Sequence, residues 1–343
     1  MIKVLVVDDS GVMRLMIRDI LEGRGTIQVV DTAVNGKEAL EKTMQFSPDV
    51  VLMDMNMGEY DGLYGVKEIM KKKPTPIILL SSIGNIDMNP IMQGLEAGAF
   101  DYLNKPAQNS TKLRDLESVL IGKVEGAYNA NLKALESKEI KSVQNAHSFV
   151  DELPYDCIVI GSSTGGPTAL ERVITKLPEN LPIPIFIAQH MPPNFVPSFA
   201  ARLGTMTSLN VVVGQKGIEV QPNTIYISPG DRNMIVSRAS SGKVEIDYSF
   251  KSYKEFNHPS VDALMYSVSE VYGKKTVGVI LTGMGRDGAD GMARLKKGGA
   301  MTIAQNESSC VVFGMPKEAI DKGCVDYVLP VTEIGVFVVS SLS

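Results

Sequence analysis

Two adjacent serines stand in a glycine-rich stretch, Gly161-Ser162-Ser163-Thr164-Gly165-Gly166, and they are the first residues that suggest chemistry. The apolar run 157–160 before it predicts a buried strand, and residues 167–174 after it predict a helix that starts with proline. A helix N-terminus presents free N–H groups and a partial positive charge. A serine held there suits nucleophilic attack on a carbonyl, because the oxyanion that forms is stabilised.

Other turn chemistries fit this stretch less well. A dinucleotide-binding loop requires a second glycine where Ser163 stands, and a phosphate-binding loop requires lysine where Pro167 stands. A hydrogen-bonded turn without chemistry remains an alternative. The residues themselves do not say which of Ser162 and Ser163 would react.

A histidine and an aspartate follow two further predicted strands. His190 comes after the apolar run 183–188, and Asp287 lies in a glycine-rich loop after the run 276–281. Because parallel strands bring their carboxyl ends to one edge of the sheet, we expect Ser163, His190 and Asp287 to meet there. Nucleophile, base and orienting acid form a hydroxyl-activating triad. Their order along the chain differs from that of lipase-like, chymotrypsin-like and subtilisin-like enzymes.

Alternatives exist for two of these roles. His258 could be the base, but it precedes a predicted helix capped by Ser260 and is expected in a loop. Asp231 or Asp290 could be the orienting acid, although Asp290 is expected in the first turn of a helix. We therefore favour His190 and Asp287.

A second group of polar residues follows predicted strands near the start of the chain. Five short strands with intervening helices predict a parallel, doubly wound sheet. The residues at the strand ends are Asp8, Asp9, Asp54, Ser81 and Lys105. Three carboxylates at one edge repel each other unless a cation joins them, and Mg²⁺ prefers such oxygen ligands. Asp9 or Ser10 could instead cap the first helix.

Residues 1–106 resemble a response-regulator receiver domain. The resemblance rests on the strand-end residues just named, on Pro106 after Lys105, and on Met57, Asp61 and Gly62 after Asp54. It implies that a histidine kinase phosphorylates Asp54. It further implies that Mg²⁺ binds at Asp8, Asp9, Asp54 and Asn56, that Ser81 and Lys105 contact the phosphoryl group, and that Tyr102 is an aromatic switch. Gly58 departs from the family's usual proline and is expected to loosen this loop.

Length and composition indicate two soluble domains. A chain of 343 residues is long enough for two cores, and we expect a receiver domain over 1–124, a polar linker over 125–152 that includes His147, and a second α/β domain over 153–343. Charge of −5 without a basic block argues against a nucleic-acid partner. No membrane span or signal peptide is evident. The cysteines, Cys157, Cys310 and Cys324, lack metal-binding spacing and are expected to be buried in a reducing cytoplasm. A cytoplasmic monomer is expected.

The second domain resembles the catalytic domain of the chemotaxis protein-glutamate methylesterase (CheB) family. The stretches that carry the resemblance are 160–166, 189–192, 226–231, 259–262, 281–288 and 312–316. The resemblance implies that Ser163, and not Ser162, is the nucleophile, with His190 as base, Asp287 as orienting acid and the Met284 N–H as an oxyanion donor. Asn233 and Asn306 depart from the family's usual residues.

The two resemblances together imply a phosphorylation-regulated hydrolase. It would demethylate glutamate methyl esters on chemoreceptor helices, release methanol and deamidate receptor glutamines, without a cofactor for hydrolysis. The implied fold is a flavodoxin-like (βα)5 receiver joined to a second doubly wound, mostly parallel domain. Two other classes remain open: a phosphorylation-gated binding module with an inactive second domain, and a DNA-binding response regulator.

Overall fold

The computed structural model describes residues 1–23, 25–81, 89–105, 113–135, 149, 152–251, 253 and 258–342. Pro106, His147 and much of the predicted linker lie outside these residues. The chain divides into two compact units, Met1–Ser137 and Lys138–Ser343. The limits 124, 125, 152 and 153 that the sequence suggests for the domains and linker stay a prediction.

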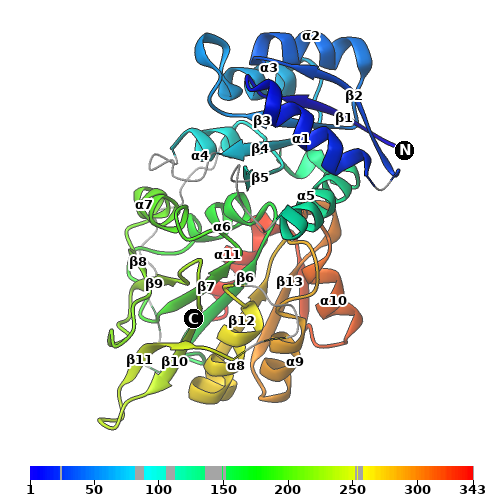
Figure 1. Ribbon diagram of the computed structural model, residues 1–343. Coiled ribbons are helices and arrows are strands. Elements are labelled where there is room, and N and C mark those ends of the chain that lie inside the picture. Colours follow the sequence, from blue (N-terminus) through cyan, green and yellow to red (C-terminus); the bar gives the residue numbers. More distant parts are fainter. Residues whose placement is uncertain are drawn as a thin grey trace. The chain divides into compact units, whose positions relative to one another are not determined.

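The first unit contains a five-stranded parallel sheet in the order β2-β1-β3-β4-β5 (Figure 1). Its strands are β1 (Ile2–Val7), β2 (Ile27–Ala33), β3 (Val50–Asp54), β4 (Ile77–Ser81) and β5 (Asp101–Asn104). Its helices are α1 (Gly11–Glu22), α2 (Gly36–Phe46), α3 (Gly62–Lys72), α4 (Asn89–Glu96) and α5 (Leu113–Tyr128), with short 3₁₀ turns η1 (Gly58–Tyr60) and η2 (Leu132–Leu135). The predicted doubly wound fold is confirmed.

Local sequence explains these elements. Strands β3 and β4 are buried along their whole length, as expected for apolar runs in the middle of a parallel sheet. Ser10 caps α1 by accepting a hydrogen bond from the Met13 N–H, so one of the two predicted caps is confirmed. Helix α5 runs to Tyr128, four residues past the predicted end at Val124, into the segment predicted as linker.

The second unit contains a seven-stranded parallel sheet in the order β14-β13-β12-β6-β7-β9-β8. Its strands are β6 (Cys157–Ser162), β7 (Ile185–Gln189), β8 (Asn210–Val213), β9 (Thr224–Ile227), β12 (Thr276–Ile280), β13 (Met301–Gln305) and β14 (Tyr327–Leu329). Strands β10 (Asn233–Arg238) and β11 (Val244–Ser249) form a separate antiparallel hairpin. The predicted strands at 157–160, 183–188 and 276–281 correspond to β6, β7 and β12.

Helices flank this sheet (Figure 1). They are α6 (Gly166–Ile174), α7 (Val196–Met206), α8 (Val261–Tyr272), α9 (Ala289–Lys297), α10 (Met315–Asp321) and α11 (Val331–Ser340), with 3₁₀ turns η3 (Gly273–Lys275) and η4 (Glu307–Ser309). Apolar residues of α8, α9, α10 and the hairpin form one buried core with the sheet, whereas α6 packs on α7 and α11. Cys157 and Cys324 belong to this core, and all three cysteines are free and buried, as predicted.

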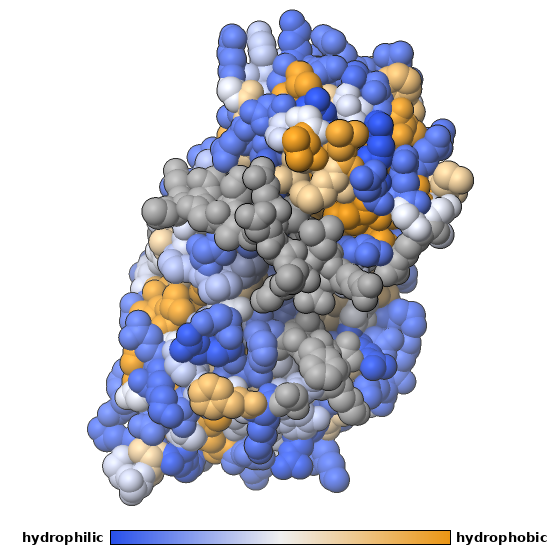
Figure 2. All heavy atoms as spheres, viewed as in Figure 1, coloured by the Kyte–Doolittle hydropathy of each residue, from blue (hydrophilic) through white to orange (hydrophobic). Residues whose placement is uncertain are grey.

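None of the described helices combines the length and apolar composition that a bilayer crossing needs. Hydrophilic residues cover most of the face in Figure 2, with apolar residues in smaller patches.

Strand β6 lies between β12 and β7, and this order positions the predicted triad. The chain passes from β6 to β7 on one side and reaches β12, on the other side, only later. A crevice at the carboxyl ends is expected where connections leave in opposite directions. Ser163 follows β6, His190 follows β7 and Asp287 lies in the loop after β12.

A close backbone contact holds the loops after β7 and β9 together. A Cβ atom on Gly230 would lie 2.3 Å from the Met191 carbonyl oxygen and 2.5 Å from the Pro193 nitrogen. Because both neighbours are backbone atoms, they cannot move aside cheaply. Only glycine therefore lets the loop after β9 support the segment that begins at His190.

We expect Gly230→Ala to destabilise the protein by about 1–3 kcal/mol, because the new methyl group overpacks this contact. Gly204→Ala is the matched control. Gly204 lies in helix α7, and a Cβ there would meet only the Val211 Cβ, at an ordinary contact distance of 3.9 Å. That control should be neutral or stabilising by up to about 1 kcal/mol. Calorimetric unfolding of the full chain measures both, and equal melting temperatures for the two variants would contradict the expectation.

Candidate active site and phosphorylation site

The two serines of the glycine-rich turn have different environments. Ser162 is the last residue of β6, is fully buried, and donates its hydroxyl hydrogen bond to Gln189 Oε1 at 2.6 Å. Ser163 is partly exposed, and its N–H donates to the Thr282 carbonyl at 3.0 Å. The chain then turns at Gly165, whose φ of +74° favours glycine, and α6 begins at Gly166 with Pro167 as its second residue. Of the two serines, Ser163 is therefore the one with exposed surface.

Gln189 connects the turn to the histidine, a contact that the sequence did not reveal. Its amide nitrogen donates to the carbonyl oxygens of Ser163 and His190, both at 2.9 Å. A Cβ on Gly166 would lie 2.0 Å from Gln189 Oε1, so glycine is needed there for the amide to fit. The one available signal was the position of Gln189 at a strand end, directly before His190.

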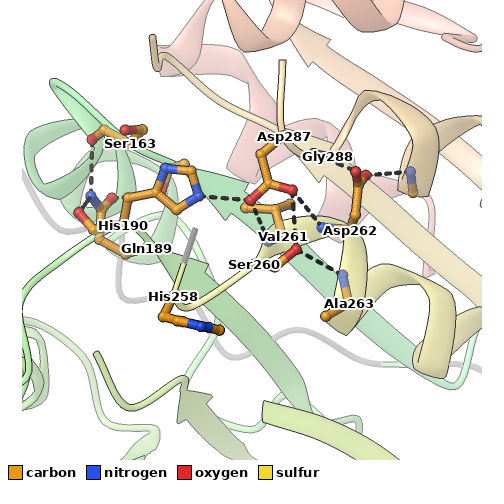
Figure 3. A network of polar contacts seen from close by, with 12 residues as sticks. Ser163, Gln189, His190, His258, Ser260, Val261, Asp262, Ala263, Asp287 and Gly288 are labelled. Atoms are coloured by element: carbon orange, nitrogen blue, oxygen red, sulfur yellow. Dashed lines mark hydrogen bonds and ion pairs between the residues drawn. The ribbon is translucent and has the colours of Figure 1, made fainter. Parts of the chain in front are cut away.

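His190 lies between Ser163 and Asp287 (Figure 3). Its Nε2 is 2.8 Å from Asp287 Oδ2, and the other ring nitrogen, Nδ1, is on the side of Ser163. Both residues are described, and no hydrogen bond joins the Ser163 hydroxyl to the ring. The structure thus brings base and acid into direct contact and places the serine on the free side of the base.

Asp287 is held at the N-terminus of α8. Its carboxylate accepts hydrogen bonds from the Val261 N–H at 2.7 Å, the Asp262 N–H at 3.0 Å and the Ser260 hydroxyl at 3.2 Å. Burial raises the pKa of Asp287, but the bond to His190 and these backbone N–H groups lower it below the ordinary value. The carboxylate is therefore charged and fixed in orientation.

The alternative residues have other partners. His258 Nδ1 is 3.2 Å from Asn233 Oδ1, which also accepts from the Ser260 N–H at 2.8 Å. Asp290 pairs with Lys322, and Asp231 pairs with Arg232. Asp290 lies in the first turn of α9 and Ser260 caps α8, as predicted. The described contacts bring none of these alternatives to His190, and Asn233 fixes the segment before α8.

The loop 282–288 passes directly beside Ser163. A Cβ on Gly283 would lie 2.8 Å from the Ser163 Cβ, and Gly283 pairs with Phe313 in an isolated bridge. The next residue, Met284, is 40% exposed, and its N–H has no acceptor among the described residues. A free backbone donor so close to the serine turn suits stabilisation of an oxyanion.

The first unit gathers its own acidic site at the ends of β1 and β3. Carboxylate oxygens of Asp8, Asp9 and Asp54 all lie within 4.8 Å of one another. Lys105 Nζ, just after β5, is 2.8 Å from both Asp8 Oδ2 and Asp54 Oδ2. One ammonium faces three carboxylates, so negative charge remains in excess. Such hard oxygen donors fit a magnesium ion.

Burial and neighbouring charges in this site shift the pKa values of Asp54 and Lys105. Burial raises the pKa of Asp54; Lys105 lowers it and Asp8 raises it, which leaves the pKa above its ordinary value. Burial lowers the pKa of Lys105, but hydrogen bonds to Asp54 and Asp8 raise it above the ordinary value. The Asn56 N–H donates to Asp54 Oδ1 at 3.2 Å.

Two further predicted residues lie near this edge. Ser81 ends β4, the strand beside β3, and its buried hydroxyl has no hydrogen-bond partner among the described residues. Tyr102 is in β5 and is buried, and burial raises the pKa of its phenol well above the ordinary value. A buried hydroxyl at the end of the strand beside β3 suits a hydrogen bond to a phosphoryl group on Asp54.

Comparisons with known proteins identify the family of each unit. A family model described as CheB methylesterase matches residues 158–338, and one described as response regulator receiver domain matches residues 4–116. Proteins named protein-glutamate methylesterase/protein-glutamine glutaminase are similar over nearly their whole length. The relative from Archaeoglobus fulgidus is 41% identical, covering 97% of this chain and 95% of its own. The relative from Thermotoga maritima is 40% identical, covering 97% and 96%.

The second unit also resembles a solved structure. The crystal structure of the Thermotoga maritima CheB methylesterase catalytic domain is 42% identical and aligns with a TM-score of 0.53, covering 54% of this chain and 98% of that chain. Fold and comparisons thus define a receiver domain followed by an α/β methylesterase domain. The chain belongs to the CheB methylesterase family. The match over residues 158–338 favours the hydrolase over a DNA-binding response regulator.

We expect Ser163→Ala to abolish hydrolysis, because it removes the exposed hydroxyl beside His190. The loss should be on the order of 10⁴–10⁶ in rate, as for a triad member in a protease. Ser162→Ala is the matched control and should retain much of the activity, since it removes only the hydrogen bond to Gln189. Methanol release from methylated receptor membranes measures both. Near-normal turnover by Ser163→Ala would exclude this serine as the nucleophile.

Proposed function

We infer that this chain is a phosphorylation-regulated serine hydrolase that demethylates glutamate methyl esters on chemoreceptors and deamidates specific receptor glutamines. It would act in the cytoplasm and serve chemotactic adaptation. The single observation that supports the chemistry best is the contact between the buried Asp287 and the partly exposed His190, beside the partly exposed Ser163. Family membership supports the substrate class.

The proposed acylation step uses the two nitrogens of His190 in distinct roles. Ser163 Oγ attacks the side-chain carbonyl carbon of the methylated glutamate while His190 Nδ1 takes the hydroxyl proton. Asp287 holds the proton on Nε2 and stabilises the imidazolium that results. The carbonyl oxygen becomes an oxyanion near the Met284 N–H and the N-terminus of α6, both of which favour negative charge.

The proton that His190 takes from Ser163 is then used to release the leaving group, and deacylation follows. The imidazolium donates its Nδ1 proton to the methoxide oxygen, so methanol leaves and an acyl-serine ester remains. A water molecule then attacks this ester, with His190 again as base, and frees glutamate and Ser163. On a glutamine substrate the leaving group is ammonia. Hydrolysis by this route requires no cofactor.

The first unit is proposed to receive the regulatory signal. Asp54 would accept a phosphoryl group from a chemotaxis histidine kinase, while Ser81 and Lys105 contact its oxygens. Asp8, Asp9, Asp54 and Asn56 would hold Mg²⁺, which neutralises charge during the transfer. The excess of carboxylates over ammonium groups at this edge supports that proposal. Phosphorylation adds about −1.5 to −2 charge, which Tyr102 and its neighbours must accommodate.

Regulation is proposed to act by obstruction. The substrate is a receptor helix, a bulky object that must reach the carboxyl edge of the second sheet. An unphosphorylated receiver tethered by the linker would block this access without disturbing the triad, and phosphorylation would release it.

We expect His190→Gln to be nearly inactive and Asp287→Asn to be strongly impaired, because the latter favours the wrong tautomer of the histidine. His258→Gln is the matched control and should have a mild effect, since His258 contacts Asn233 instead of the triad. Initial rates of methanol release measure all three. Inactivity of His258→Gln together with activity of His190→Gln would show that the base has been misassigned.

We expect the isolated fragment from Pro154 to Ser343 to demethylate receptors faster than the unphosphorylated full-length protein, because the blocking domain is absent. Initial rates at matched enzyme concentration measure this difference. A slower fragment would argue against obstruction and for a receiver that recruits the receptor. A full-length chain that releases no methanol with a phosphodonor would favour the phosphorylation-gated binding module.

Asp54→Ala is the control for the phosphoryl signal. This variant should keep the full-length protein at its low rate even when a phosphodonor is present, because the acceptor carboxylate is gone. Stimulation of Asp54→Ala to the wild-type rate would show that the phosphodonor acts elsewhere.

A further inference from the structure

Asp262, in the first turn of α8, forms a closed ring of hydrogen bonds with the segment that carries Asp287 (Figure 3). Its N–H donates to Asp287 Oδ1 at 3.0 Å. Its own carboxylate oxygen Oδ1 accepts from the Gly288 N–H at 3.0 Å. Asp262 therefore both donates a hydrogen bond to the segment 287–288 and accepts one from it. A rotation of either backbone segment would weaken both hydrogen bonds.

The ring joins the N-termini of two helices. Asp287 precedes α9 and accepts from the first N–H groups of α8, whereas Asp262 belongs to α8 and accepts from Gly288 and Gly291 of α9, the latter at 2.6 Å. Each carboxylate thus caps the helix to which it does not belong. Both carboxylates gain from the partial positive charge of a helix N-terminus.

The backbone that Asp262 holds has little freedom of its own to compensate. Gly288 has a φ of +91°, and a Cβ there would lie 2.7 Å from Val261 Cγ1 and 2.8 Å from Ile280 Cδ1. Asp262 is 5% exposed, so water cannot readily replace its carboxylate as an acceptor. The direction in which Asp287 leaves the backbone is therefore set by the bond from Gly288 to Asp262.

We propose, on the basis of the triad inferred above, that Asp262 is a positioning residue that orients Asp287, and through it His190, by reciprocal capping of α8 and α9. Asp262 touches neither substrate nor serine. It acts on the angle and distance between the Asp287 carboxylate and His190 Nε2, which are 2.8 Å apart.

The ionisation state of Asp262 affects how strongly its carboxyl group accepts these hydrogen bonds. Burial and the nearby charges of Asp287 and Asp290 raise the pKa of Asp262 to about 7, although the Gly291 and Gly288 N–H groups lower it. The other titratable groups with electrostatic interactions here are Tyr266 on the same helix and Lys322 at the end of α10. When Asp262 is ionised, its carboxylate is a stronger acceptor for the Gly288 and Gly291 N–H groups than the protonated acid is.

Two substitutions separate the bonds from the charge. Asp262→Ala removes the acceptor for both α9 N–H groups, and kcat for methanol release should fall roughly 10- to 100-fold, because small misplacements of catalytic groups are costly. KM should stay within about twofold, since substrate contacts are intact. Asp262→Asn keeps an amide oxygen as acceptor and should retain kcat within about threefold at pH 8.5, measured on the full-length protein with a phosphodonor.

The pH profile tests a role that a merely structural cap would not have. Protonation weakens Asp262 as an acceptor, whereas an amide does not titrate, so the ratio of wild-type kcat to Asp262→Asn kcat should fall as the pH drops through about 7. Asp290→Asn is the matched control: it removes a carboxylate in the first turn of α9, which pairs with Lys322 at 2.8 Å. Its kcat should stay within about twofold of wild type.

Each contrary result would overturn the proposal. An Asp262→Ala variant with wild-type kcat would do so, as would an Asp262→Asn variant as slow as Asp262→Ala. A ratio of wild-type kcat to Asp262→Asn kcat that stays constant through pH 7 would also overturn it. If Asp262→Ala does not fold, the rate and pH profile of Asp262→Asn still decide. Failure of the triad itself is distinguishable, because His190→Gln and Asp287→Asn would then remain active in the same assay.

Discussion

The second unit depends on one interaction, the burial of the Asp287 carboxylate against the N-terminus of α8. A buried negative charge is costly unless it is hydrogen-bonded and paired. Here three donors of α8 and the imidazole of His190 satisfy it, so the charge fixes a helix, a loop and a histidine together. The parallel sheet brings these segments close together, because β12, β6 and β7 are neighbours and end at the same edge.

The first unit solves a related electrostatic problem in another way. Asp8 and Asp54 are buried beside each other and share the ammonium of Lys105, while Asp9 is exposed. The carboxylates of the second unit are satisfied by protein N–H groups, so that site is already complete. The carboxylates of the first unit outnumber the ammonium group that faces them, and the buried hydroxyl of Ser81 has no partner among the described residues. Excess carboxylate oxygens and a buried hydroxyl are the groups that the proposed metal ion and phosphoryl group would contact.

The sequence predicted much of the fold because buried parallel strands have a strong local signal. Apolar runs indicated β1, β3, β4, β6, β7 and β12, and the polar residue after each run indicated the functional edge. Prediction was less exact where local signals are weak. The last helix of the first unit runs to Tyr128, since polar residues can continue a helix without an apolar stripe. The domain limits themselves remain a prediction.

By itself, the sequence determined which residue types follow which strands, and hence that Ser163, His190 and Asp287 share an edge. Only the tertiary structure decided that Ser162 is buried against Gln189, and that Asp262 and Asp287 cap each other's helices. These contacts join residues 25 or more positions apart, and no periodicity in a sequence encodes them. They exist because the sheet order and the packing of α8 on α9 bring two helix N-termini and two carboxylates together, where each needs the other to satisfy its hydrogen bonds.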